Sequence, residues 1–451
     1  MIIPGDTVMN IEEKAMNFAI KAHYGQVRKS EKDKPMIIHP INVGQILKEY
    51  EFDSNVIAAG YLHDVVEDTK YEEEDILNEF GSDIASLVMG ASEIDKSLSW
   101  EERKQHTIDT IKNLSLRHKA VVCADKISNL EDLMILSLKN NKYDFSSFKR
   151  GYDEQKWYYT EVYKSLTFNE EHPMFDRLKQ LIDNIFKDSK DNYIRDVIFD
   201  NDAEYIEVEK LHYKKLEVNK LRKIFELDPY VIEFTGTPRT GKTTLINNLK
   251  DFFKKGGFDI SVLEEFTTSK RYKETIYKKL KNQYKKMLNT EIPKCILKDL
   301  EEELQKDKDI IIIDRSLFDR LIWVDRSYLK NGMSLDEYSD YKKFYIPKIK
   351  EKINIIVSTY TDTLTSLKRD YKANLSLEKR NFLNITNIDE YNKSLLNMKD
   401  LAKDEALNFH MFDTTDKNER RISIEVANTI LNDMRNYYLS GIKNEIEARI
   451  K

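Results

Sequence analysis

The feature that most constrains the fold is the stretch GTPRTGKTTL, residues 236–245. It fits the pattern G-x-x-x-x-G-K-[ST]. It follows the apolar run YVIEF and precedes TLINNLKDFFKKGG, a helical pattern that stops at glycines. In that setting the glycines let backbone N–H groups face a phosphate chain at the positively polarised start of a helix. The sequence therefore predicts a nucleotide-binding α/β unit in the C-terminal half.

Short apolar runs recur after Pro229, with helical patterns between them. They cover residues 230–236, 259–266, 309–316, 352–360 and 408–415. Strands that alternate with helices indicate a parallel sheet covered on both faces. We expect a P-loop α/β domain over residues 229–440, followed by a tail at 441–451.

The first 190 residues have a different pattern, with apolar residues at helical spacing in one segment after another. The segments NIEEKAMNFAIKAHYG, SNVIAAGYLHDVVED, EEEDILNEFGSDIASLVMGAS and HKAVVCADKISNLEDL are examples. We expect an all-α domain over residues 1–190. The highly charged residues 191–228 are interpreted as a helical linker whose charges form a solvated face.

Composition narrows the class of protein. The net charge is -6 and 34% of the residues are charged, which gives no strong signal for nucleic-acid binding. The two cysteines, Cys123 and Cys295, form no disulfide framework and fit a cytoplasmic protein. Cys123 lies in an apolar run and is interpreted as a buried, inert thiol rather than a nucleophile. No signal peptide or membrane span is expected.

Four ionisable residues stand close together in YLHDVVEDT, residues 61–69. Taken as a helix, the stretch places His63 four residues before Glu67, and Asp64 four residues before Asp68, so each pair shares a face. Several unpaired carboxylates on one face would repel each other, and burying them would be costly. A divalent cation relieves both problems. The alternative is an exposed acidic helix end.

Two further segments favour the metal. His39 in MIIHPI is flanked by apolar residues and precedes Pro40, which indicates a helix boundary. Asp125 interrupts the apolar run AVVCADKI, and Asn129 follows it on the same helical face. Taken singly, such a histidine is usually a packed core residue, and such an aspartate usually caps a helix or pairs with a cation.

The order His39, His63-Asp64, Asp125 resembles the HD superfamily of metal-dependent phosphohydrolases. The segments AHYGQVRKS, IHP, AAGYLHDVVEDT, EFG and ADKISNL narrow the resemblance to the hydrolase domain of RelA/SpoT-type proteins. Those domains remove the 3′-pyrophosphate of the alarmones ppGpp and pppGpp. The resemblance covers residues 10–190.

This resemblance implies roles for individual residues. It implies Mn²⁺ bound by His39, His63, Asp64 and Asp125, with Glu67 and Asp68 as the catalytic acidic pair. Arg28 would lie by the nucleobase, and Lys29, Ser30 and Asn129 would contact phosphate or sugar. Where the family usually has arginine and histidine, this chain has Lys126 and Ser128. The change leaves the metal site intact and leaves the substrate open between ppGpp, NADPH and another nucleotide.

The P-loop predicts a second set of roles. Lys242 would reach the β- and γ-phosphates of ATP, and Thr243 would ligate Mg²⁺. Asp314 ends the apolar strand DIIIID, where a P-loop protein places its Mg²⁺-directed acid. The ATP-binding residues are predicted to be Gly236, Thr237, Pro238, Arg239, Thr240, Gly241, Lys242, Thr243 and Thr244.

The continuation DRSLFDRLIW resembles nucleoside and nucleoside-monophosphate kinases, in particular thymidylate-kinase-like and deoxynucleoside-kinase-like enzymes. By this resemblance Arg315 contacts the phosphoryl acceptor, and Glu264 or Glu265 meets its sugar or base. The stretch 366–380 would be a basic lid, and FDTTD (412–416) a loop near adenine. The lid candidates are Lys368, Arg369 and Arg380.

Two hypotheses follow for the whole chain. One is a bifunctional enzyme of small-molecule nucleotides: a Mn²⁺-dependent hydrolase of a 3′-phosphorylated nucleotide, joined to an ATP- and Mg²⁺-dependent kinase. The other is an alarmone-type hydrolase regulated by ATP binding to a non-kinase P-loop domain, in stress or phage response. Because all the implied metal ligands and P-loop residues are present, a protein that only senses nucleotides has less support.

Overall fold

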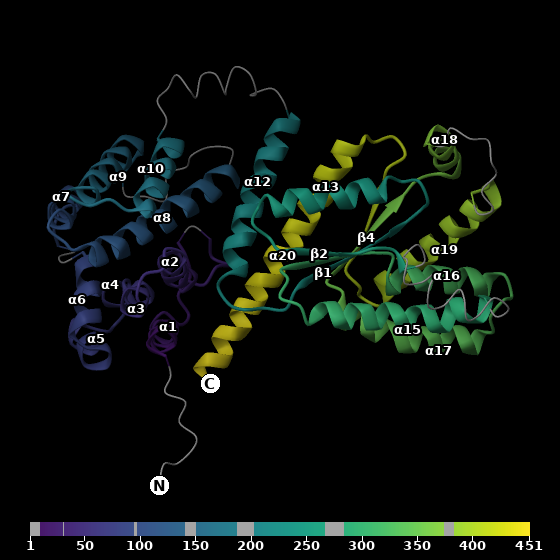
Figure 1. Cartoon of the computed structure of the whole chain (residues 1–451), viewed down its shortest axis with the longest axis horizontal. Coiled ribbons are helices and arrows are strands. Elements are labelled where there is room, and N and C mark those ends of the chain that lie inside the picture. Colours follow the sequence, from purple (N-terminus) through teal and green to yellow (C-terminus); the bar gives the residue numbers. More distant parts are fainter. Residues whose placement is uncertain are drawn as a thin grey trace, which may run out of the picture. The chain divides into compact units, whose positions relative to one another are not determined.

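The computed structural model describes residues 10–29, 31–93, 97–139, 150–186, 203–266, 284–373 and 383–451. The chain divides into two compact units (Figure 1). The first comprises Met1–Glu226 together with Arg435–Lys451, and the second comprises Leu227–Met434. Each is described by itself below.

The first unit is built of helices, as its apolar periodicity predicts. They are α1 (Ile11–Ala22), α2 (Ile38–Glu49), α3 (Ser54–Leu62), α4 (Val65–Asp68), α5 (Glu73–Phe80), α6 (Ser82–Ala91), α7 (Trp100–Ile111), α8 (Leu116–Lys139), α9 (Tyr152–Leu166), α10 (Pro173–Ile185) and α12 (Ala203–Arg222). Capping side chains start several of them. Asp53, for example, accepts hydrogen bonds from the backbone N–H groups of Asn55 and Val56 at the start of α3.

Two segments expected as single helices are each divided. The segment 72–92 breaks at Gly81, whose φ of +83° is left-handed and separates α5 from α6. The segment 54–68 breaks at His63 and Asp64, between α3 and α4. The second break lies within the cluster of ionisable residues.

Close packing of α2 on α3 positions this cluster. Gly44 faces Tyr61, and a Cβ atom added at Gly44 would lie 2.1 Å from Tyr61 Cε1. A Cβ atom added at Gly60 would lie 2.5 Å from Leu47 Cδ1. The two glycines therefore let the helix backbones approach closely. The approach brings His39, at the start of α2, near His63, at the end of α3.

Two segments expected outside the domains belong to the first unit. Within the expected linker, residues 203–222 form α12, which buries Leu211, Val218 and Leu221. The expected tail 441–451 lies almost wholly in α20 (Glu419–Ile450), with Ile442 and Ile446 buried. Apolar residues on one side of each segment explain the packing, and in α12 the charged residues Lys215 and Glu217 are buried with them.

The second unit contains a five-stranded sheet in the order β2-β3-β1-β4-β5, with all neighbouring strands parallel. The strands are β1 (Tyr230–Gly236), β2 (Ile260–Leu263), β3 (Ile310–Asp314), β4 (Ile355–Tyr360) and β5 (Phe409–Asp413). Each lies within a predicted apolar run, so the predicted α/β fold is confirmed. The helices are α13 (Lys242–Lys254), α15 (Tyr284–Leu304), α16 (Leu317–Leu329), α17 (Leu335–Lys352), α18 (Thr363–Ala373), α19 (Ile385–Asp404) and the first part of α20.

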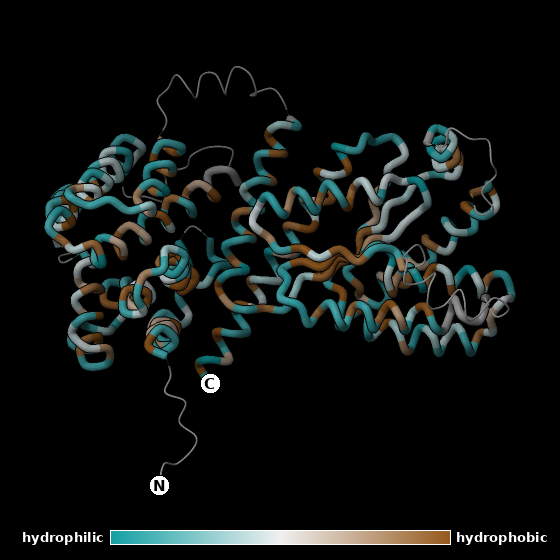
Figure 2. The backbone as a smooth tube through the Cα atoms, in the orientation of Figure 1, coloured by the Kyte–Doolittle hydropathy of each residue, from teal (hydrophilic) through white to brown (hydrophobic). Residues whose placement is uncertain are grey.

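Helices cover the sheet on both faces. Alternate strand residues, including Val231, Ile311 and Ile356, pack with α15, α16, α17 and α19 in one core. Figure 1 shows α13 on the opposite side of the sheet, and Figure 2 shows that the central strands are the most hydrophobic part of this unit. This burial on both faces explains why the strands read as continuous apolar runs.

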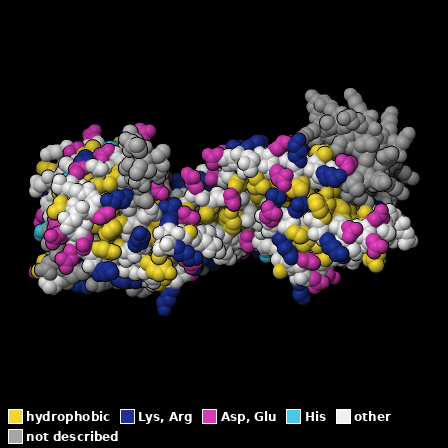
Figure 3. All heavy atoms as spheres, turned by 90° about the horizontal axis from the view of Figure 1, so that it is seen from below, with side chains coloured by type: hydrophobic (Ala, Val, Ile, Leu, Met, Phe, Trp, Pro, Cys, Tyr) yellow, Lys and Arg dark blue, Asp and Glu magenta, His cyan; other side chains and the backbone are white. Residues whose placement is uncertain are grey.

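The surface carries charges of both signs. On the face drawn in Figure 3, Lys and Arg side chains are interspersed with Asp and Glu among the described residues. None of the helices in the described part of the chain is both long enough and apolar enough to cross a membrane.

Candidate functional site

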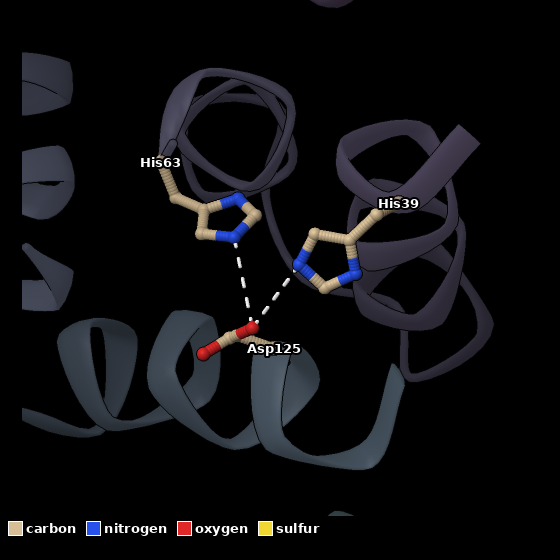
Figure 4. Close-up of side chains that lie close together, drawn as sticks. All are labelled: His39, His63 and Asp125. Atoms are coloured by element: carbon tan, nitrogen blue, oxygen red, sulfur yellow. Dashed lines mark ion pairs between the residues drawn. The ribbon is translucent and has the colours of Figure 1, made fainter. Parts of the chain in front are cut away.

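Two histidines and an aspartate of the first unit converge on one point. His39 lies in the first turn of α2, His63 directly follows α3, and Asp125 lies within α8. One possible ligand atom from each lies within 4.8 Å of the others. The Nε2 atoms of His39 and His63 lie 3.2 and 3.7 Å from Asp125 Oδ1 (Figure 4). This donor set suits a divalent transition metal.

Asp64 lies at the same point. Its Oδ1 atom is 3.2 Å from His63 Nε2, and its Oδ2 atom is 3.6 Å from His39 Nε2. In an unbroken helix, consecutive side chains point about 100° apart. His63 and Asp64 form a turn between α3 and α4, with right-handed helical dihedral angles at both residues, and both face one centre. The continuous helix expected over residues 61–69 was therefore wrong in this detail.

Hydrogen bonds fix the orientation of both imidazole rings. His63 Nδ1 lies 2.9 Å from the Gly60 carbonyl oxygen, so Nδ1–H donates and Nε2 is the ring nitrogen left to face the carboxylates. His63 Nε2 is buried and has no hydrogen-bond partner among the described residues. His39 Nδ1 lies 3.0 Å from Ser128 Oγ. Metal-binding histidines typically make such bonds through the other ring nitrogen, so the residues present fit a metal ion.

The charge states of His39 and Asp125 fit a metal ion, whereas at His63 the carboxylates of Asp64 and Asp125 outweigh burial and raise the pKa to about 9, so a metal would displace a proton from that ring. Burial lowers the pKa of His39, which favours the neutral imidazole that a metal requires. Burial alone would raise the pKa of Asp125, but Lys126 and the two histidines outweigh it and hold that pKa well below its usual range. Asp125 is therefore an anionic donor at neutral pH.

The acidic pair lies in the wall of a cavity of about 600 Å³ beside this centre. Burial raises the pKa of Glu67 to about 7. Glu67 Oε1 accepts a hydrogen bond of 2.6 Å from the backbone N–H of Glu93, which fixes the carboxyl group. Asp68 lines the same cavity. A carboxyl group with a pKa near neutrality can both take and give a proton.

The candidate nucleotide-binding residues line this cavity where they are described. Arg28, Lys29 and Asn129 do so, whereas Ser30 lies outside the described residues. Arg28 Nη2 lies 2.7 Å from Asp132 Oδ2. Asn129 Nδ2 donates a 2.6 Å hydrogen bond to Asp125 Oδ1, so Asn129 supports a candidate metal ligand.

The two departures from the family pattern both contact the centre. Lys126 Nζ lies 2.7 Å from Asp125 Oδ2 and 5.6 Å from the centre of the Tyr158 ring. Ser128 Oγ contacts His39 Nδ1 and Asn42 Nδ2, each at 3.0 Å. Lysine and serine thus contact two of the candidate metal ligands.

Sequence reasoning missed several residues of the cavity wall. Gln26, Glu93, Asp132 and Tyr158 line it and were not singled out. Asp132 could have been found, because it follows Asn129 by three residues on the same helical face. Tyr158 lies in a run of aromatic residues, but the sequence does not indicate which of them faces the cavity.

In the second unit the P-loop joins β1 to α13. Gly241 has a left-handed φ of +85°, and α13 begins at Lys242. Lys242 forms an ion pair with Asp314 at the end of β3. Thr243 is exposed in the first turn of α13. The glycine-lysine-threonine end of the loop is thus placed at a helix N-terminus, where phosphates bind.

Neighbouring elements fix the rest of the loop. Gly236 has a φ of +138°, and a Cβ atom there would lie 2.0 Å from the Thr359 carbonyl oxygen. Thr237 Oγ1 donates to Asn392 Oδ1, and Thr240 Oγ1 bonds to Thr359 Oγ1.

The middle of the loop contacts α18. Ser366 Oγ donates a 2.7 Å hydrogen bond to the Pro238 carbonyl oxygen, and Arg239 Nε lies 2.7 Å from Asp370 Oδ1. Thr244 lines a cavity beside the loop.

Arg315 is held in a strained conformation, with φ of +62°. Its guanidinium group contacts Asp319 Oδ1 at 2.7 Å and the Gly236 carbonyl oxygen at 3.0 Å. Glu265 lies 3.6 Å from Arg315 Nε, whereas Glu264 is exposed. Of the two glutamates, Glu265 is therefore the one beside Arg315.

The lid candidates differ from one another. Arg369 lines the cavity beside the P-loop, which has a volume of about 310 Å³. Its Nη1 atom donates to Thr414 Oγ1 at 3.0 Å, so Arg369 faces the late loop 412–416. Lys368 is exposed, and Arg380 lies outside the described residues.

Comparisons with known proteins agree with both halves. The chain matches the HD domain family over residues 15–144 and an AAA domain family over residues 231–347. It is 39% identical over 124 residues to guanosine-3′,5′-bis(diphosphate) 3′-pyrophosphohydrolase MESH1 of Drosophila melanogaster, covering 27% of this chain and 69% of that protein. It is 37% identical over 129 residues to the guanosine-3′,5′-bis(diphosphate) 3′-pyrophosphohydrolase of Borreliella burgdorferi, but spans only 19% of that protein's length.

A solved structure resembles the second unit. Deoxyadenosine kinase from M. mycoides with bound dCTP is 24% identical, with a TM-score of 0.31, over 45% of this chain and 98% of that one. That score is too low to support an inference about activity. The match to MESH1, in contrast, spans more than two thirds of that protein. Through its N-terminal part, the chain therefore belongs to the HD-domain family that includes the MESH1 guanosine-3′,5′-bis(diphosphate) 3′-pyrophosphohydrolases.

Proposed function

We propose that the first unit is a metal-dependent hydrolase that removes pyrophosphate or phosphate from the 3′ position of a (p)ppGpp-like nucleotide. The observation that carries this proposal is the buried Nε2 atom of His63, which lies 3.2 Å from Asp64 Oδ1 and 3.7 Å from Asp125 Oδ1. A ring nitrogen buried among carboxylates in this way suits a cation. The names of the relatives agree with the proposed reaction.

The proposed metal is Mn²⁺, held by His39, His63, Asp64 and Asp125. When bound, such an ion lowers the pKa of water and polarises a phosphoryl group. Glu67, with its pKa raised to about 7, would take the proton of the attacking water, and Asp68 would orient that water. Attack at the phosphorus would break its bond to the 3′ oxygen, and that oxygen would then take up a proton.

The cavity wall suggests how the nucleotide is bound. The positively charged residues Arg28, Lys29 and Lys126 line the cavity that also holds the candidate metal ligands. A polyphosphorylated nucleotide is strongly anionic, so these side chains would raise its local concentration and fix its orientation. The proposal names ppGpp first and keeps NADPH as a competitor.

The test is a panel of nucleotides with Mn²⁺, read by release of phosphate or pyrophosphate. We expect turnover of ppGpp, loss of that turnover on chelation, and a 10²- to 10⁴-fold loss in Glu67→Gln with metal still bound. Asp75→Asn, which changes an acid in the first turn of α5, is the matched control and should keep full turnover. Absence of turnover on every 3′-phosphorylated nucleotide would refute the proposal.

We further propose that the second unit transfers the γ-phosphoryl group of ATP, with Mg²⁺, to a nucleoside or nucleotide. The ion pair of Lys242 with Asp314 supports this, because it places the phosphate-binding cation beside the expected metal-directed acid. Glu265 beside Arg315 would meet the acceptor. In the competing hypothesis, ATP binds this unit only to regulate the hydrolase.

One comparison separates the two hypotheses. Hydrolysis is measured with and without ATP, in the wild type and in Lys242→Ala, beside transfer of labelled phosphate to a nucleoside panel. If the two activities are independent, Lys242→Ala should lose the transfer of labelled phosphate. Hydrolysis should then be the same in both proteins, with and without ATP. An ATP effect on wild-type hydrolysis that Lys242→Ala removes, without any transfer, would refute the kinase and favour regulation.

A further inference from the structure

Helix α12 lies beyond residues 15–144, the part of the chain that matches the HD domain family, yet it contacts the candidate hydrolase site. Its Lys220 contacts Ser128 and Asp132 of α8, which support different sides of that site, and lies 3.9 Å from Glu131 of the same helix. We propose that Lys220 is a positioning residue that holds the nucleotide-binding side and the metal-binding side of the site together. The proposal rests on the hydrolase function proposed above.

On the nucleotide-binding side, Lys220 acts through Asp132. Lys220 Nζ lies 2.6 Å from Asp132 Oδ1, and Arg28 Nη2 lies 2.7 Å from Asp132 Oδ2. The Lys220 side chain is only 10% exposed. Asp132 is thus shared between two cations, so it neutralises Arg28 less completely than an exclusive ion pair would, and Lys220 itself also lies 3.9 Å from Glu131 Oε2. Without Lys220, Asp132 would neutralise Arg28 more completely.

On the metal-binding side, Lys220 acts through Ser128. Lys220 Nζ donates to the Ser128 carbonyl oxygen at 3.3 Å and lies 3.4 Å from Ser128 Oγ. Ser128 Oγ in turn contacts His39 Nδ1 at 3.0 Å. Lys220 is therefore two contacts away from both a candidate metal ligand and a candidate nucleotide-binding arginine.

A second contact, one turn earlier on α12, holds the segment that carries Arg28. Glu217 is buried, and its Oε1 atom lies 2.7 Å from Lys34 Nζ and 2.8 Å from Arg435 Nε. The Lys34 carbonyl accepts a 3.0 Å hydrogen bond from the Arg28 N–H. The two residues joined by this backbone hydrogen bond are therefore each connected to α12. Arg28 is connected through Asp132 and Lys220, and Lys34 through Glu217.

Loss of the Lys220 charge should therefore affect substrate binding more than the chemical step. Truncating one member of a buried charge cluster weakens binding of a charged ligand substantially. We expect Lys220→Met to raise the KM for ppGpp about tenfold or more, with kcat changed less than threefold. Lys220→Arg, which keeps the charge, should recover most of the loss.

The matched control is Lys223→Met on the same helix. Lys223 also forms an ion pair, 2.6 Å from Glu49, but at the surface and away from the cavity wall. We expect that variant to keep the wild-type KM. Circular dichroism confirms folding of each variant, and Lys220→Gln replaces Lys220→Met if the latter does not fold.

A second readout does not depend on activity. Amide hydrogen exchange in the segment 26–36 should be faster in Lys220→Met than in the wild type, and unchanged in Lys223→Met. Unchanged exchange and an unchanged KM in Lys220→Met, or a loss that Lys220→Arg does not rescue, would overturn the proposal. If the wild type hydrolyses no nucleotide, the hydrolase function fails, whereas the exchange comparison still decides whether Lys220 holds this segment.

Discussion

Replacing Ser128 by alanine tests whether the hydrogen bonds behind the metal centre matter. The Ser128 side chain is fully buried, and its Oγ contacts His39 Nδ1 and Asn42 Nδ2, each at 3.0 Å. The substitution removes only the hydroxyl group. His39 Nδ1 and Asn42 Nδ2 would lose this partner, and Lys220 Nζ would lose a longer contact of 3.4 Å.

The contacts set the expected magnitude. A buried polar group left without a partner costs about 1–3 kcal/mol. We expect Ser128→Ala to lower the free energy of unfolding of the first unit by about 2 kcal/mol. Because His39 would also lose the group that orients its ring, Mn²⁺ affinity should fall by about 10- to 100-fold.

The assay is urea unfolding without metal, followed by tryptophan fluorescence, beside calorimetric titration with Mn²⁺. Trp100 and Trp157 report on the first unit. Ser165→Ala is the matched control: Ser165 is also buried, but its hydroxyl has no partner among the described residues. That control should be neutral or slightly stabilising and should keep its Mn²⁺ affinity. Equal effects of the two substitutions would refute the reasoning.

Three further predictions concern single side chains. Asp64→Ala should lose bound metal and hydrolysis together, as measured by metal analysis beside phosphate release; full hydrolysis by this variant after chelation would contradict the ligand role. Gly236→Ala should destabilise the second unit by at least about 2 kcal/mol in denaturant unfolding, because its Cβ atom would lie 2.0 Å from the Thr359 carbonyl oxygen; unchanged stability would disprove that close approach. Cys123 should resist iodoacetamide in the folded chain while the half-buried Cys295 reacts, because burial excludes the reagent and raises the pKa of the Cys123 thiol; mass spectrometry after labelling would detect the opposite result.

Much of the second unit could be predicted because its signals are local. Strands buried on both faces are continuous apolar runs, so each observed strand lies within a predicted run. The loop 236–243 needs glycines, a lysine and a threonine at fixed spacing, between a strand and a helix. Which glutamate stands beside Arg315 was not predictable, since Glu264 and Glu265 are consecutive and only the end of β2 decides which one turns inward.

In the first unit, the sequence by itself determined which residue types could bind a metal and on which segments they lie. It could not show that α3 ends before His63, because the local pattern continues as a helix. Only tertiary packing of α2, α3 and α8 decided that His63 and Asp64 turn towards Asp125.

The same limit applies to residues 191–228, which were predicted to be a helical linker. Residues 203–222 carry many charges, and a charged helix usually faces solvent. Whether Glu217 and Lys220 face water or a buried partner depends on Lys34 and Asp132, which lie more than 80 residues away. Helical periodicity is encoded locally, whereas the pairing of buried charges is decided by which distant segments pack together, and that only the tertiary structure determined.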